Sequence, residues 1–208
     1  MSDSEALVRN VRWLGHASIV VRGSKTVYVD PWEVSAADPA DVILVTHDHF
    51  DHLSLPDIDR LSRAGTAVVG PAMCRQALGR RLTAIEPGGA VTVEGVPVEA
   101  VRAYNPKKQF HPKDYGGLGY VFTVDGVRYY HCGDTDRIPE MDAVRADVVF
   151  VPVGGKYTMD AAEAAEVPAL VGARAAVPMH FGKIVGNAAD AKTFARLCKV
   201  PVVVLERS

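Results

Sequence analysis

Apolar residues occur in short runs along this chain, and a Gly, Pro or Asp residue bounds most of these runs. Runs of four to eight residues rich in Val, Ile, Tyr and Phe are typical of β-strands. The pattern predicts strands at residues 10–15, 18–23, 26–30, 41–47, 66–70, 91–101, 119–126, 127–134, 147–155, 175–180 and 200–206. The strands on either side of Asp125-Gly126 should form a hairpin, because that dipeptide suits a two-residue primed turn.

Helical spacing of apolar residues is less common, and it predicts helices at residues 54–65, 72–79, 160–172 and 190–199. The third of these begins with Asp160 and carries Glu163 three residues later, the pattern of a capping box. Three strand segments, 41–45, 147–153 and 202–205, are almost continuously apolar, which is typical of strands covered on both faces. Many strands with helices among them predict two layered sheets with helices outside, an α/β fold of the mixed α+β kind.

The chain length of 208 residues is enough for one domain with a proper core and short for two, so we expect a single domain spanning residues 1–208. The composition is that of an ordinary globular protein, with 48% hydrophobic and 23% charged residues. The formal net charge of −2 provides no overall basic field that would attract nucleic acid.

The cysteines and the N-terminal segment predict where the protein resides. Cys74, Cys132 and Cys198 show no paired spacing, which favours a reducing compartment over a disulfide framework. The first ten residues, MSDSEALVRN, are acidic and polar and lack the apolar core of a signal peptide. No apolar run approaches the roughly 20 residues that a bilayer-spanning helix needs. We therefore expect a soluble, cytoplasmic protein with no membrane partner.

The segment THDHFDH, residues 46–52, directly follows the predicted buried strand 41–45. It places three imidazoles and a carboxylate within six positions, from His47, His49, Asp51 and His52. A polar surface loop is the alternative interpretation, but these groups would crowd or repel one another unless a cation lay among them. The spacing therefore predicts a metal site at the end of this strand.

Two further candidate ligands also stand at the ends of predicted strands. His180 follows the apolar run AAVPM, and Asp134 lies at the end of the strand 127–134. A lone histidine at a strand end is more often structural, but here a metal cluster is already predicted and needs further ligands. We therefore predict that His180 and Asp134 complete the metal site.

The sequence resembles the metallo-β-lactamase fold hydrolases, whose metal signature is similar to His47-x-His49-x-Asp51-His52, Asp134 and His180. The stretches WLGHASIVV, VDPW, THDHFDH, HCGDTD, GGKYTMDAAEA and PMHFG are similar to the ascorbate-6-phosphate lactonase-like branch. They extend from residue 13 to residue 182 and so cover most of the chain. The resemblance implies a four-layered αββα sandwich with a two-metal site at one edge of the sheets.

Carried over by position, the resemblance implies that His47 and His49 bind the first metal together with a third protein ligand. It assigns His52, His180 and Asp51 to the second metal and makes Asp134 a bridge between both. Histidine and carboxylate ligands suit Zn²⁺, and the carboxylates leave Mn²⁺ or Fe open. The expected cofactors are two divalent metal ions, with Zn²⁺ favoured.

The third ligand of the first metal departs from the family pattern. The family usually carries a histidine just before the Gly-rich hairpin, whereas this chain reads VRAYNPKKQFHPKDYGGLGY at residues 101–120. The strand end offers Tyr104 and Asn105, and His111 follows a few residues later. We expect His111 to replace the missing ligand, with Asn105 as the alternative and a mononuclear centre as a third interpretation.

Other residues near the predicted site have two interpretations each. His16 in LGHAS resembles a family position close to the site, so it either contacts substrate or packs structurally. Asp30 in VDPW resembles the Asp that hydrogen-bonds the ligand loop and orients the ligands, and starting a turn before Pro31 is its alternative role. We expect His131 to be structural and Cys132 not to be a ligand.

The predicted reaction is hydrolysis. Two divalent ions a few Å apart can share a hydroxide whose pKa is lowered towards neutrality. Such a centre needs no Ser or Cys nucleophile, and the chain contains no Gly-x-Ser-x-Gly segment. Asp51, Asp134 and His180 are the expected catalytic residues, with Asp51 as ligand and proton acceptor. Asp48 is expected to order the loop or to face solvent.

Lysines near the predicted site suggest a substrate class. Lys107, Lys108 and Lys113 surround His111, and Lys156 and Lys183 lie in loops expected at the same edge. They are either solvated surface side chains or a binding pocket for phosphate or carboxylate on the substrate. The favoured hypothesis is a metal-dependent hydrolase of a small, anionic ester, lactone or phosphodiester.

Two other functions remain as alternatives. A nuclease-like phosphodiesterase acting on nucleic acid is disfavoured by the net negative charge and by the lack of a basic recognition domain. A non-catalytic metal-binding member of the fold is disfavoured by the bridging Asp134, because a structural zinc site is normally closed by four ligands. A homo-oligomer is compatible with the resemblance, but no apolar stripe assigns an interface.

Overall fold

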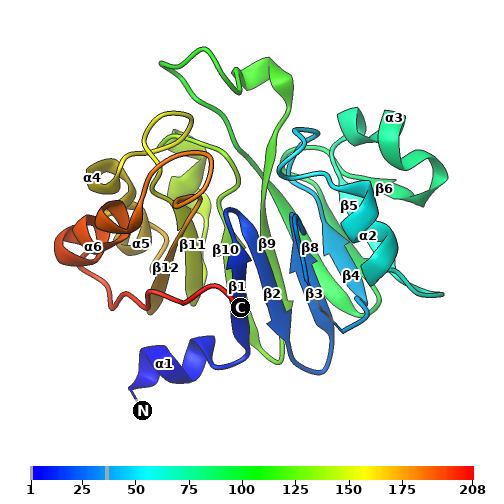
Figure 1. Ribbon diagram of the computed structural model, residues 1–208, viewed down its shortest axis with the longest axis horizontal. Helices are drawn as coiled ribbons and strands as arrows, with labels where there is room; N and C mark the ends of the chain where they lie inside the picture. The colour runs from blue at the N-terminus through cyan, green and yellow to red at the C-terminus, as the bar shows by residue number, and fades with distance from the viewer. Residues whose placement is uncertain (1, 36–37) are drawn as a thin grey trace.

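The computed structural model describes residues 2–35 and 38–208 and contains two six-stranded β-sheets that pack face to face (Figure 1). The first sheet has the order β1-β2-β3-β4-β5-β6 and consists of Val11–Gly15, Ser18–Arg22, Thr26–Val29, Val42–Leu44, Ala67–Gly70 and Leu82–Ala84. Strands β1 to β3 are antiparallel neighbours, and strands β3 to β6 run parallel.

The second sheet repeats this mixed arrangement in the order β12-β11-β10-β9-β8-β7. From β7 to β12, its strands are Ala90–Val93, Val96–Arg102, Leu118–Val124, Val127–His131, Val148–Pro152 and Ala175–Met179. Strands β7 to β10 are antiparallel, and β10 to β12 run parallel. The β9–β10 hairpin turns at Asp125 and Gly126, whose φ angles of 50° and 78° are those of a primed turn, so the predicted hairpin is confirmed.

Strands β3 and β4 are covered on both faces because their alternate residues enter different cores. Val27 and Val29 belong to the cluster that includes the second sheet, whereas Tyr28 and Ile43 belong to the cluster beneath the helices of the first sheet. The side chains on both faces are fully buried. A continuously apolar strand needs two covered faces of this kind, so the prediction for residues 41–45 is confirmed. The same prediction is wrong for residues 202–205, where Val204 is 48% exposed.

Helices form the two outer layers (Figure 1). Helices α2 (Leu55–Leu61) and α3 (Arg75–Leu78) lie beside the first sheet, and α4 (Ala161–Ala164), α5 (Val167–Leu170) and α6 (Ala188–Leu197) lie beside the second. Ile58 and Leu61 of α2 share the outer core of the first sheet, and Phe194 of α6 enters the larger core. The layers are helix, sheet, sheet and helix, which confirms the αββα sandwich that the resemblance implied.

The predicted strand 200–206 is wrong, because this segment pairs with two different sheets. Val202 forms a single bridge to Ala176 of β12, and Arg207 then bridges Trp13 of β1. Strands β12 and β1 are edge strands of separate sheets, so a segment that passes from one to the other cannot continue a ladder along either.

Other differences arise from turn and capping chemistry. The predicted strand 91–101 is a hairpin of β7 and β8, whose turn at Glu94-Gly95 has positive φ at both residues. The predicted helix 160–172 is divided into α4 and α5, with Pro168 in the first turn of the second piece. Asp160 caps α4 by accepting hydrogen bonds from two backbone N–H groups, but Glu163 accepts from the Arg137 N–H instead of closing a capping box.

One α-helix and one β-strand were not predicted. Helix α1 (Asp3–Val8) begins with a capping box between Ser2 and Glu5, and strand β6 adds a three-residue edge to the first sheet. None of the helices in the described ranges combines the length and the hydropathy needed to cross a bilayer.

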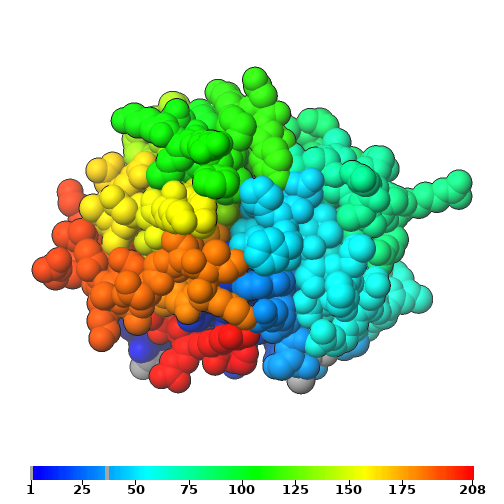
Figure 2. All heavy atoms as spheres, turned by 45° about the horizontal axis from the view of Figure 1, so that its top comes forward, coloured from blue at the N-terminus to red at the C-terminus, as the bar shows by residue number. Residues whose placement is uncertain are grey.

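The topology brings the carboxyl ends of several strands to one edge of the sandwich. Strands β3 and β4 run parallel in the first sheet, and β10, β11 and β12 run parallel in the second. The segments that follow these strands therefore emerge at a shared edge, the usual place for a site in sheets of this kind. In Figure 2 the segments around residues 50, 110, 157 and 184 meet near the centre of one face.

Candidate metal centre

The structure brings all seven predicted ligands together at this edge. His47, His49, Asp51 and His52 lie in the loop after β4, Asp134 follows β10, and His180 directly follows β12. His111 reaches the same place from the long connection between β8 and β9. Their donor atoms form overlapping groups, in each of which all the atoms lie within 4.8 Å of one another.

His47, His49 and His111 form the first cluster of donor nitrogens. The His47 Nε2 and His49 Nδ1 atoms are 3.0 Å apart, and the His111 Nε2 atom is 3.2 Å from the same His49 Nδ1. Three imidazole nitrogens that point at one another at these distances are the arrangement that a single cation among them would organise.

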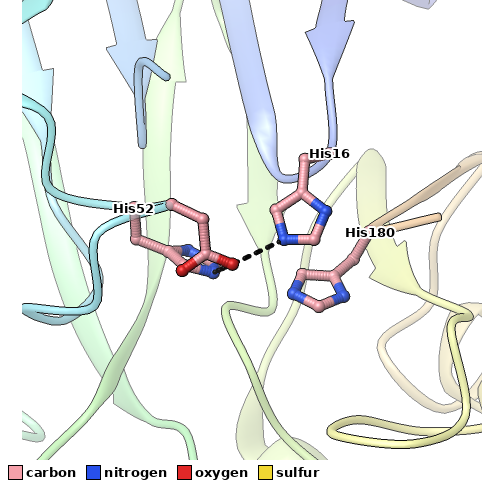
Figure 3. A group of neighbouring side chains, drawn as sticks. His16, His52 and His180 are labelled. Atoms are coloured by element: carbon pink, nitrogen blue, oxygen red, sulfur yellow. Dashed lines mark hydrogen bonds and ion pairs between the residues drawn. The ribbon is translucent and has the colours of Figure 1, made fainter. Parts of the chain in front are cut away.

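Asp51, His52 and His180 form the second cluster, together with His16. The His16 Nε2 atom lies 3.0 Å from Asp51 Oδ2, and the His52 Nε2 atom lies 3.9 Å from the same oxygen. Figure 3 shows His16, His52 and His180 converging from three separate segments of the chain.

Asp134 lies between the two clusters. Its Oδ2 atom is 3.0 Å from His180 Nε2 and 3.5 Å from His52 Nε2 in the second cluster. The same oxygen is 3.7 Å from His111 Nε2 in the first cluster. One buried carboxylate therefore faces both sets of donors.

Asp30 connects the backs of both clusters. Its Oδ2 atom lies 2.7 Å from His52 Nδ1 and also accepts a hydrogen bond of 2.6 Å from the Thr46 hydroxyl. The Thr46 oxygen is in turn 2.9 Å from His47 Nδ1. Bonds of this kind set the ring orientation and leave the opposite nitrogen, Nε2, free to bind a metal. The carboxylate of Asp30 is completely buried.

A separate chain of hydrogen bonds holds His111. The Asn105 Oδ1 atom is 2.8 Å from His111 Nδ1, and the Asn105 amide donates a 2.9 Å hydrogen bond to Asp136. The Asn105 backbone N–H also donates to the His111 carbonyl oxygen at 2.8 Å. Asn105 therefore lies behind the imidazole of His111, and His111 is the residue that presents a donor atom to the cluster.

His16 supports the second cluster in two ways. Its imidazole contacts the Asp51 carboxylate, and its backbone carbonyl accepts a 2.8 Å hydrogen bond from the His180 backbone N–H. The His16 and His180 rings lie 3.8 Å apart between centroids. The short turn between β1 and β2 thus orients Asp51, which follows a strand of the first sheet, and His180, which follows a strand of the second. The sequence left the role of His16 open, and these contacts favour the structural one.

Backbone strain is concentrated at this site. His16, Asp30, His111 and His180 have φ angles of 50°, 45°, 55° and 59°, in the left-handed region that residues other than glycine rarely adopt. Such conformations cost about 1–3 kcal/mol each and persist where the surrounding structure enforces them. The fold therefore holds these side chains towards one point at a cost in folding free energy.

The electrostatics of the buried groups favour a cation. Burial lowers the pKa of His47 and of His111, which keeps these imidazoles in the neutral form that binds metals. Burial also opposes a charge on His52, but the Asp134 and Asp30 carboxylates raise its pKa well above the usual value. The two carboxylates thus stabilise a positive charge at His52 strongly enough to overcome the cost of burying it.

Polar atoms without partners indicate where that charge would lie. Among the described residues, the buried atoms His52 Nε2 and Asp134 Oδ1 have no hydrogen-bond partner. Burial opposes ionisation of Asp134, yet His180 and His52 hold its pKa well below the usual range, so the carboxylate is charged. An unpartnered imidazole nitrogen and an unpartnered carboxylate oxygen facing one point fit a divalent metal ion.

The remaining histidine, His131, is structural, as predicted from its place on the strand. The His131 Nε2 atom is 2.9 Å from the Ala17 carbonyl oxygen, and its Nδ1 accepts a hydrogen bond from the Gly133 N–H. These bonds require the neutral tautomer with a proton on Nε2, and burial lowers the pKa of His131 accordingly. Cys132 is fully buried and belongs to none of the donor groups in the described residues.

The three lysines expected to bind substrate lie elsewhere. Lys108 forms an ion pair with Asp136 and donates to the Thr158 carbonyl oxygen at 2.6 Å. Lys113 pairs with Glu140 at 2.9 Å, and Lys107 is exposed on the surface. None of the three lines the cavity over the metal ligands. The charges of Lys108 and Lys113 are thus directed at acidic neighbours of the loop rather than at the site.

Several residues of the site were not found from the sequence. Thr46 and Asp136 connect ligands to the rest of the fold, and the Tyr115 hydroxyl donates a hydrogen bond to Asp48. Asp48 therefore orders the ligand loop, one of the two roles expected for it. Thr46 stands directly before His47, and a hydroxyl next to a ligand is the only signal that could have indicated such a role.

A cavity of about 240 Å³ opens over both clusters and Asp134. His49, His111 and His180 line its floor together with Asp51 and Asp134. Larger hollows occur on other parts of the surface, but they contain none of the donor residues. The chemistry of the donor set, rather than cavity size, identifies the site.

Comparisons with known proteins agree with the fold and the site. The profile of the family described as "Beta-lactamase superfamily domain" matches residues 10–180. A "UPF0173 metal-dependent hydrolase" of Methanoculleus marisnigri is 37% identical over 179 residues, covering 81% of this chain and 79% of that protein. Another of that description, from Methanoregula boonei, is 33% identical over 197 residues, covering 89% and 87% of the two chains.

A solved structure shows the same architecture. The crystal structure of a protein from Parabacteroides distasonis is similar with a TM-score of 0.85 at 28% identity, covering 95% of this chain and 93% of that one. The family profile, the relatives and the cluster of His and Asp donors agree. The chain therefore belongs to the beta-lactamase superfamily and is one of its metal-dependent hydrolases.

Proposed function

We infer that this protein hydrolyses a small ester or lactone, or a phosphodiester, with two divalent metal ions bound at adjacent positions. The observation that carries this inference is the Asp134 carboxylate, whose Oδ2 lies within 3.7 Å of donor nitrogens from both clusters. A single closed site needs no such shared ligand. His47, His49 and His111 would hold the first ion, and Asp51, His52 and His180 the second. Zn²⁺ suits these ligands best, and Mn²⁺ or Fe is compatible with the carboxylates.

When bound, the two ions would supply a water nucleophile of lowered pKa and a Lewis acid for the substrate oxygen. The residues of the chain have separate roles in this reaction. Asp51 is partly accessible from the cavity and is the carboxylate placed to accept a proton from the water. His16, at 3.0 Å from Asp51 Oδ2, keeps that carboxylate turned towards the site.

The balanced reaction for an ester needs only water. The water oxygen forms a bond to the acyl carbon, and the bond from that carbon to the alcohol oxygen breaks. One proton passes from water to the departing alcohol oxygen, with Asp51 placed to carry it, and the acid product ionises. No oxidant, reductant or further substrate takes part.

The number of metals per chain tests this proposal. Protein purified without chelator and loaded with Zn²⁺ should contain about two ions per chain by elemental analysis, and His111→Ala should contain about one. Lys113→Ala is the matched control, because it changes an exposed residue of the same loop, and it should keep both ions. One ion in the wild type, or two in His111→Ala, would contradict the assignment of the first cluster.

A further inference from the structure

Exposed hydrophobic side chains are gathered at the mouth of the metal-site cavity. Among the described residues, five large hydrophobic side chains are classed as exposed, and three of them line this cavity. These three are Phe50, Phe110 and Ile184, with exposed fractions of 71%, 45% and 39%. Tyr157 is the fourth member of the group, which we call the apolar rim. Exposed apolar clusters of this kind usually mark a contact surface.

The apolar rim comes from four separate segments of the chain. Phe50 lies in the ligand loop after β4, Phe110 in the connection after β8, Tyr157 after β11, and Ile184 after β12. Figure 2 shows these segments meeting at one place on the surface. The Phe110 and Tyr157 rings meet edge to face at 4.8 Å, and the Phe50 ring contacts Trp32 in a similar way at 6.0 Å. Four loops thus contribute apolar surface to a single opening.

No lysine or arginine of the described residues lines this cavity. Lys183, next to Ile184 in sequence, forms an ion pair with Glu33 and lies 4.6 Å from the centre of the Trp32 ring. Lys156 lies 4.9 Å from the centre of the Tyr157 ring and is directed at its face. An anionic substrate group would meet aromatic and aliphatic carbon at the rim and would lose water without gaining a partner.

The cavity volume limits the size of the apolar group. About 240 Å³ lies below the range of roughly 300–1,000 Å³ that is usual for drug-sized ligands, so the cavity suits a small group. A phenyl ring or a short branched alkyl chain of the substrate would reach the rim. The carbonyl of the same substrate would then lie at the metal centre, beside Asp134 and His180. The polar floor and the apolar mouth together describe an amphipathic substrate.

We propose that the substrate is uncharged and carries a small aromatic or branched aliphatic group, which binds against the apolar rim beside the bond to be hydrolysed. This inference rests on the proposed hydrolytic function. It replaces the anionic substrate expected from the lysines, none of which lines the cavity. Ile184 and Tyr157 are the rim residues suited to a test of selectivity, because Phe50 and Phe110 each stand next to a donor residue in the sequence.

Binding can be measured separately from turnover with two ketones that lack a bond to hydrolyse. Ligand-observed NMR on the Zn²⁺-loaded protein would give the dissociation constants of 4-phenyl-2-butanone and of 4-oxopentanoate. The neutral phenyl ketone should bind about tenfold more tightly than the anionic ketone. Ile184→Ser should weaken the binding of the phenyl ketone about fourfold or more, because the substitution removes apolar contact area. Leu197→Ser is the matched control, since Leu197 is 46% exposed on α6 and outside the cavity.

Turnover can be compared with two methyl esters that share a leaving group. The kcat/KM for methyl phenylacetate should exceed that for monomethyl succinate by about tenfold. Ile184→Lys should lower the first value and raise the second, because it places a cation at the rim. The same variant should still bind about two metals per chain, which separates a specificity change from damage to the centre.

The outcomes separate the two proposals. Tighter binding or faster hydrolysis of the anionic compound would overturn the substrate class and leave the hydrolase in place. If Ile184→Ser and Leu197→Ser behave alike towards both ketones, the rim is not a substrate contact and serves a macromolecular partner instead, which also overturns the inference. If the phenyl ketone binds in an Ile184-dependent manner but esters, lactones and phosphodiesters are all left intact, the hydrolytic function fails while the apolar site stands.

Discussion

The two donor clusters share the loop after β4 and differ in the support of their remaining ligand. In the second cluster His180 directly follows β12, and Asp30 at the end of β3 bonds to His52 of the shared loop. In the first cluster, His111 lies in the connection between β8 and β9 and is held through Asn105. A ligand on a rigid strand end keeps its orientation, but a ligand on a loop must be ordered by its neighbours. We therefore expect the first ion to be bound more weakly than the second.

The largest effect is expected for Asp134→Asn, which removes the charge that faces both clusters. The affinity for both ions should fall by more than about 100-fold, the upper end for residues that only support a ligand. Elemental analysis after dialysis would measure the loss in each site. Retention of one tightly bound ion would show that Asp134 belongs to one cluster alone.

A loss of about 10- to 100-fold in metal affinity is expected for Asp30→Asn. Asp30 bonds to His52 directly and to His47 through Thr46, so both clusters should weaken. Asp41→Asn is the control, because Asp41 accepts a backbone hydrogen bond from Thr26 away from the site. A variant of Asp30 that affects only the second ion would disprove the connection through Thr46.

Asn105→Ala should lower the metal affinity of the first cluster alone. It removes the acceptor behind His111 Nδ1, so the first ion should bind about tenfold more weakly while the affinity for the second is unchanged. Competition with a chelator, followed by metal counting, would measure both affinities. An equal effect on both ions would mean that the loop and the strand ends do not act as separate supports.

The smallest effect is expected for His16→Gln, which acts on the second cluster through Asp51. The Asp51 side chain is 12% exposed and so retains some contact with water, which limits the cost of losing His16. The kcat should fall by up to about tenfold, and both ions should remain bound. Loss of the second ion in this variant would instead make His16 a metal ligand, as its place in the donor group allows.

The sequence predicted the strand-end residues of the site because local spacing encodes them. His47, His49 and His52 lie within six positions of one loop, and His180 directly follows an apolar run. Parallel strands deliver their following residues to a shared edge, so convergence follows from the fold class. The two sheets and their outer helices could likewise be predicted, from the apolar runs along the chain and from its resemblance to the metallo-β-lactamase fold hydrolases.

The loop residues could not be oriented from the sequence in the same way. The direction of the Lys108 and Lys113 side chains depends on Asp136 and Glu140, which lie more than 20 residues further along the chain. The apolar rim combines Phe50, Phe110 and Ile184 from segments with no common periodicity. The left-handed backbone at His111 and His180 is likewise imposed by surrounding contacts and leaves no mark in the residue type.

Stepwise removal of metal would distinguish two unequal metal sites from one. Protein loaded with Zn²⁺ would be equilibrated with increasing chelator, and the ions remaining per chain would be counted by elemental analysis. We predict about two ions at the start, a plateau near one as the loop-supported first site empties, and an earlier onset of that plateau in Asn105→Ala. A wild-type protein that never holds more than one ion, or an Asn105→Ala variant with an unchanged curve, would contradict a centre built from two unequal halves.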